Sequence, residues 1–146
     1  MTALEIAALR QMAVRVLTRQ AGPGADAAAL AVAARRAYDA LARVLVPLIG
    51  QVGIDALATR AVHLAQRDYP WLVTTREPEQ AEGPFTQVSF SLEWQEPALA
   101  TEAAAAVFAI FTSLLVTFIG EPLTRRLMRN AWPEGFSDAG TEETRA

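Results

Sequence analysis

The sequence predicts an all-α fold: a compact bundle of about five helices around one central hydrophobic helix at about 97–120. Alanine, the strongest helix former, accounts for 30 of the 146 residues, and arginine and leucine are also abundant. Only 8 glycines and 8 prolines interrupt the chain, which favours a few long helices. The length suits one domain. We place this domain at 1–133 and expect 134–146 to form a flexible polar and acidic tail.

The first half of the chain is expected to form three helices. Residues 3–20 place apolar positions at helical spacing, and a Gly-Pro-Gly sequence at 22–24 ends this helix. Asp26 is suited to cap a second helix, which we expect Pro47 to bend near its end. After a short turn at 50–53, a third helix is predicted from Ile54 to Pro70.

The second half begins with a segment that loses the helical period. Residues 73–96 are predicted to form an irregular loop or a short helical turn whose aromatic side chains cover the core. A strand is the alternative, because apolar residues alternate between 85 and 94, but the chain shows no convincing second strand to pair with it. Pro97 suits the first turn of a fourth helix, and Glu121 and Pro122 begin a fifth that ends before Pro133.

A short sequence occurs twice in similar form. The segment LVPLIG at 45–50 matches LVTFIG at 115–120 at four of six positions, and each copy precedes a helix that ends at a Pro–Trp pair. Two helical hairpins with similar turns would explain the match. Coincidence in a chain rich in aliphatic residues is the alternative.

The fourth helix carries no charge from 103 to 120, and two interpretations follow. A helix buried inside a soluble bundle is the favoured one, because the other helices have apolar faces that need a core. A membrane span over 103–120 is the alternative, since eighteen residues reach about 27 Å. One side of this helix carries only small residues, which would allow close contact with the second helix or with a second copy of the chain. This candidate self-association ridge consists of Ala105, Ala109, Ser113 and Thr117.

Composition disfavours several classes of function. The chain has no cysteine, no lysine and one histidine, so it offers little material for a catalytic triad, a metal site or a bound cofactor, and we predict none of them. A net charge of −3 disfavours nucleic acid as a partner. The charge is also uneven, at +3 over residues 1–72 and −5 over residues 73–102, so basic and acidic regions can pair within a chain or between copies.

Two groups of polar residues are candidate sites. Arginine and tryptophan dominate the binding energy of many interfaces, so the end of the fifth helix is the candidate interaction surface: Arg125, Arg126, Arg129 and Trp132. A second cluster on the third helix consists of Arg60, His63 and Arg67, and it leaves open a phosphotransfer or ligand-sensing role for the histidine.

We therefore expect a non-catalytic protein of bacterial type, since abundant alanine and arginine without lysine are typical of GC-rich bacterial genomes. Its expected role is protein–protein interaction, as a regulatory or accessory subunit in the cytoplasm whose partner is another protein or a second copy of itself. The alternatives are a helical domain that uses His63 and a small membrane-anchored protein that spans at 103–120.

Overall fold

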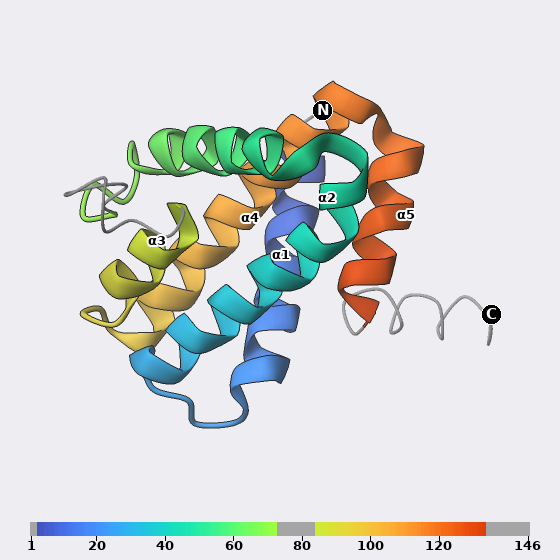
Figure 1. The fold of residues 1–146 in the computed structure, drawn as a ribbon. Helices are drawn as coiled ribbons and strands as arrows, with labels where there is room; N and C mark the ends of the chain where they lie inside the picture. Colours follow the sequence, from blue (N-terminus) through green and yellow to red (C-terminus); the bar gives the residue numbers. More distant parts are fainter. Residues whose placement is uncertain (1–2, 73–83, 134–146) are drawn as a thin grey trace.

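The computed structural model describes residues 3–72 and 84–133, and within these ranges its regular secondary structure is entirely α-helical. The helices are α1 (Ala3–Ala21), α2 (Ala27–Ala65), α3 (Pro84–Leu92), α4 (Pro97–Ile119) and α5 (Glu121–Ala131) (Figure 1). They pack against one another, which confirms the predicted all-α bundle. The predicted tail at 134–146 and residues 73–83 of the predicted loop lie outside the described residues.

Helix α4 is the central element of the bundle. It contacts α1, α2, α3 and α5, and eleven of its residues are buried, from Ala100 to Leu115. Its last turn differs, because Phe118 is 64% exposed and Thr117 is also exposed. The expected central hydrophobic helix is therefore present, but it emerges at the surface where it ends.

The second and third predicted helices form the two arms of α2, a first arm at 27–49 and a second arm at 51–65. Gly50 alone has non-helical backbone angles, with φ 80° and ψ 160°, so one residue replaces the predicted four-residue turn. Pro47 lies inside the first arm, three residues before this break. The second arm ends at Ala65, short of the predicted Pro70, and turns carry the chain on from there.

Residues 84–92 of the segment predicted at 73–96 form helix α3. An irregular loop is wrong for these residues, and the alternative of a short helical turn over the core is closer. Phe85, Val88 and Leu92 are all buried, and their spacing places them on one face of a helix. Val88 and Leu92 also belong to an alternating pattern with Phe90 and Trp94, which hid the helical spacing. Proline at the first position of α3 is compatible with a helix start, because the missing N–H has no partner there in any helix.

The repeated sequence marks two turns with the same backbone conformation. Gly120, with φ 91° and ψ 156°, separates α4 from α5 as Gly50 separates the arms of α2. The first arm and α4 are each 23 residues long, and each follows an acidic residue in extended conformation, Asp26 or Glu96. With a shift of 70 residues, identity continues into the next helices at Leu57/Leu127 and Ala61/Ala131. These features support an internal structural repeat. We call the two turns the Gly50 elbow and the Gly120 elbow.

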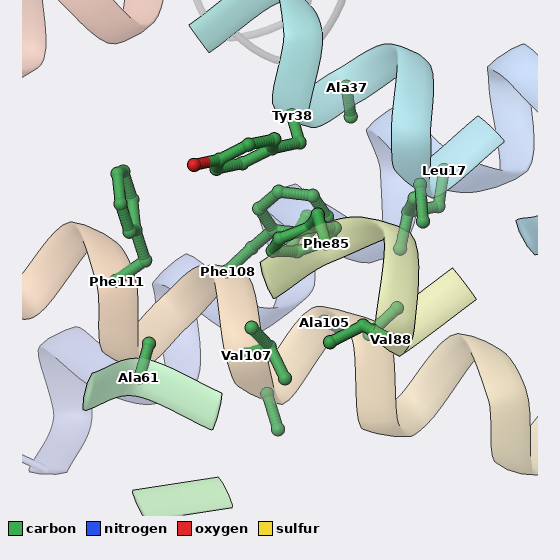
Figure 2. Packing of buried hydrophobic residues seen from close by; sticks show 14 of the residues in the cluster. Leu17, Ala37, Tyr38, Ala61, Phe85, Val88, Ala105, Val107, Phe108 and Phe111 are labelled. Atoms are coloured by element: carbon green, nitrogen blue, oxygen red, sulfur yellow. The ribbon is translucent and has the colours of Figure 1, made fainter. Parts of the chain in front are cut away.

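Aromatic side chains from four segments meet in the core. The rings of Tyr38 and Phe85 stack at 4.5 Å, those of Phe85 and Phe108 at 4.8 Å, and Trp132 packs edge-on against Phe108 at 5.1 Å. Figure 2 shows Tyr38 above Phe85 and Phe108, with its hydroxyl directed away from both rings. This column joins α2, α3 and α4 to the residue that follows α5.

Replacing Gly50 or Gly120 with alanine should destabilise the fold by about 1–3 kcal/mol each, because their backbone conformation is accessible almost only to glycine. The cost is conformational, since no clash of an added Cβ arises at either position. Denaturant unfolding measures it. Gly53→Ala is the matched control: Gly53 is helical, and its Cβ would lie 3.6 Å from that of Ile49, so stability should hold or rise by about 0.5–1 kcal/mol. Equal losses of stability in all three variants would contradict the special role of the backbone conformation at Gly50 and Gly120.

Candidate functional site

The four residues of the predicted interaction surface at the end of α5 do not lie on one surface. Arg125, Arg126 and Arg129 are exposed, but Trp132 is only 1% exposed. Its indole Nε1 donates a hydrogen bond to the carbonyl oxygen of Ala37 at 3.0 Å. Helix α5 ends at Ala131, and the backbone of Trp132 is not helical. Its side chain therefore does not continue the row of arginines but lies in the core. Trp132 is therefore a core residue.

The arginines line a shallow groove on α5 with a volume of about 400 Å³, formed by Glu121, Pro122, Arg125, Arg126 and Arg129. Arg125 forms an exposed ion pair with Glu121 at 2.7 Å, and such i,i+4 pairs contribute only about 0.3–0.5 kcal/mol. The side chain of Arg126 has no hydrogen-bond or ion-pair partner among the described residues. The groove therefore keeps positive charge available beside the Gly120 elbow.

Exposed apolar side chains lie beside both elbows. Val46, Leu48 and Val52 flank Gly50 and are 38%, 49% and 85% exposed, and Phe118 precedes Gly120. The first arm of α2 packs against α4, and both elbows lie at the same end of the bundle, at the upper right of Figure 1. We call these four apolar residues, together with Arg125, Arg126 and Arg129, the elbow surface.

The predicted self-association ridge does not lie on the surface as a whole. Ala105 and Ala109 are each 1% exposed, Ser113 is half-buried and Thr117 is exposed. Helices α1 and α2 both pack on α4, and the small side chains allow this close approach within one chain. Only the end of the ridge, next to the elbow surface, is accessible to a second molecule.

The His63 cluster is accessible but contains few interactions. Arg60 and His63 are exposed on the second arm of α2, and Arg67 lies beyond the end of that arm. Within 3–72 and 84–133, no group of three or more histidine, aspartate or glutamate residues is placed to hold a metal ion.

A polar cleft beside Tyr38 was not predicted from the sequence. Its volume is about 340 Å³, and it opens between the two arms of α2 and the start of α3. The Asp55 Oδ1 accepts hydrogen bonds from the Tyr38 hydroxyl at 3.3 Å and from the Gln51 amide at 2.9 Å. Tyr38 and Asp55 are 17 residues apart across the Gly50 elbow, so no local spacing reveals the pair. Arg35, Asp39 and Thr86 complete the polar lining.

The Tyr38 hydroxyl keeps its proton in this cleft. Burial raises the pKa of the Tyr38 hydroxyl well above its usual value of 10, and the charge of Asp55 and the hydrogen bond to it act in the same direction. A phenol in its neutral form donates a hydrogen bond. The Tyr38 hydroxyl donates to Asp55 and so connects the two arms of α2.

Two helices in the described residues are long and apolar enough to cross a membrane, α2 and α4. Length and composition alone are weak evidence, because the core helix of a soluble protein meets the same criteria. Gly50 breaks α2, and 56% of the apolar window of α4 is buried inside the bundle. Comparison with known proteins adds no assignment: no family model, no curated protein and no solved structure matches this chain.

Replacing Trp132 with alanine should cost about 3–5 kcal/mol of folding stability, as expected for a large buried aromatic side chain. Trp132→Phe keeps a ring but loses the bond to Ala37, and it should cost about 1–2 kcal/mol. Thermal or denaturant unfolding checks both values. Arg126→Ala is the surface control and should change stability by no more than about 0.5 kcal/mol. A Trp132→Ala protein as stable as wild type would contradict the placement of Trp132 in the core.

The stability of the fold should decrease as the pH rises above about 10, the ordinary tyrosine pKa. The pKa of Tyr38 is raised in the folded state, so the unfolded chain loses this proton first and alkaline pH favours unfolding. The chain has no lysine or cysteine to obscure the effect. Urea unfolding at pH 8 and pH 11 measures the loss, and Tyr38→Phe should reduce it. Part of the loss should remain in Tyr38→Phe, because burial also raises the pKa of Tyr69.

Proposed function

We propose that this chain is a non-catalytic protein–protein interaction protein, a regulatory or accessory subunit, which associates with itself through the elbow surface. The observation that supports this function is the exposure of apolar side chains at both elbows, at one end of the bundle and next to arginines. Isolated exposed apolar residues are common on soluble proteins, but their concentration at one site is typical of an interface.

The composition of the elbow surface also suits an interface. Aromatic residues and arginine are enriched at protein interfaces, and Phe118 lies close in sequence to the three arginines. Complete burial of a valine, leucine or phenylalanine side chain contributes roughly 1.5–3 kcal/mol. The partly exposed side chains of the elbow surface can therefore supply a useful part of the free energy of association.

A membrane surface is the competing occupant, because apolar residues beside arginines also suit an interface with anionic lipid. The elbow surface favours protein instead. The exposed Glu121 carboxylate is paired with Arg125, so it removes one arginine charge that could bind anionic headgroups. A protein partner can hydrogen-bond such a carboxylate.

The test measures self-association of the full chain by sedimentation velocity over a wide concentration range. We expect concentration-dependent assembly that Val52→Ser and Phe118→Ser each weaken about tenfold, the factor for a loss of 1.4 kcal/mol. Val32→Ser is the matched control, because Val32 is 46% exposed on α2 but is distant in sequence from the elbow. A monomer at all concentrations would overturn self-association. Co-sedimentation of that monomer with anionic phosphatidylserine vesicles, lost in Phe118→Ser, would assign the surface to lipid.

A further inference from the structure

The turn between α3 and α4 forms a second exposed apolar site, with the opposite charge. Trp94 is 85% exposed and Phe90 is 52% exposed, and the carboxylates of Glu93 and Glu96 lie beside them in the sequence and are also exposed. We call these four residues the acidic corner. It belongs to the region of the chain with the largest negative charge, residues 73–102 at −5.

The backbone holds the acidic corner in a defined turn. The Glu93 N–H donates to the carbonyl oxygen of Ser89, and the Trp94 N–H donates to that of Ser91. Leu92, next to this turn, is fully buried and anchors it to the core. The corner therefore presents the Trp94 ring to solvent from an ordered backbone, so little backbone entropy is lost when the corner binds.

The acidic corner and the elbow surface of one chain cannot meet. The corner precedes the first residue of α4 and the Gly120 elbow follows its last, and 23 residues of helix span about 34 Å. Figure 1 shows the α3–α4 turn and the two elbows at opposite ends of the molecule. Their complementary charges can therefore be paired only between two copies.

We infer that the acidic corner of one copy is the partner of the elbow surface of the next, an inference that rests on the proposed self-association. The Trp94 indole occupies the groove on α5, where the Arg126 guanidinium can lie against its face. Glu93 and Glu96 lie within the reach of Arg125 and Arg126. Because the two faces differ, the contact is head-to-tail and generates rings or open chains, whereas a self-complementary face generates a two-fold dimer.

Charge reversal at each face tests this pairing. The corner-reversed variant carries Glu93→Arg and Glu96→Arg, and the elbow-reversed variant carries Arg125→Glu and Arg126→Glu. Each variant alone presents like charges on its two faces and should remain monomeric by sedimentation velocity. An equimolar mixture should assemble again, because each reversed face then meets its complement. Restored assembly also shows that both variants are folded, and it should weaken as salt is raised.

Two further variants sharpen the result. Trp94→Ala removes an exposed ring without touching the core and should weaken association at least tenfold. Arg36→Glu with Arg60→Glu makes the same change in net charge as the elbow-reversed variant, at exposed positions outside both faces, and should leave association intact.

The outcomes separate this inference from the proposed function. If Phe118→Ser weakens association while the corner-reversed variant and Trp94→Ala associate like wild type, the elbow surface meets another elbow and the head-to-tail pairing is overturned. If the mixture of reversed variants stays monomeric although each has a native circular dichroism spectrum, the pairing is overturned as well. A wild-type chain that is monomeric throughout overturns both the proposed function and this inference.

Discussion

The structure depends on the backbone conformation of two glycines. Gly50 and Gly120 end two long helices in extended, positive-φ geometry and begin new helices at the next residue. A chain that changes direction within one residue leaves the last turn of the first helix with few neighbours. Val46, Leu48 and Phe118 lie in these last turns, so the same constraint that folds the bundle also exposes apolar side chains at one end.

The aromatic column joins segments from both halves of the chain. Tyr38, Phe85, Phe108 and Trp132 come from segments spread over most of the described chain, and each ring contacts the next. The Trp132 indole then returns to the backbone of the first arm of α2 at Ala37, 95 residues away in the sequence. This connection fixes the end of α5 against α2. The direction of the arginines on α5 is therefore a consequence of core packing.

The sequence predicts the helical class and the position of α4 because these depend on composition and on an uncharged run of 18 residues. It also predicts the start of α5, where Glu121 and Pro122 follow the glycine directly. Helix α3 was predicted only as a short helical turn, the alternative to a loop, because its nine residues make barely more than two turns. Val88 and Leu92 also fit an alternating pattern with Phe90 and Trp94. A segment of about two turns has too few residues for apolar spacing to distinguish a helix from a strand.

The candidate site was predicted only in part, for a related reason. The arginines of α5 follow from local sequence, whereas Trp132 was assigned to the surface because it is close to them along the chain. Its burial depends on the edge-on contact with Phe108, a residue of another helix, and only the packed structure shows that contact. The exposed apolar residues at the elbows were not predicted, because apolar spacing indicates which face of a helix is buried but not where along the helix its cover ends.

The placement of charge relative to α4 is the feature that connects fold and proposed function. Acidic residues lie at the start of this helix and arginines follow its end, and each group accompanies exposed aromatic or aliphatic side chains. Within one molecule this separation stabilises nothing, because about 34 Å of helix lies between charges that are screened over about 8 Å at physiological salt. Between copies, the same separation makes the two ends attractive to each other and each end repulsive to its own kind. In the self-association that we propose, such a distribution selects one direction of assembly, and the apolar side chains beside the charges supply the contact free energy that screened charges lack.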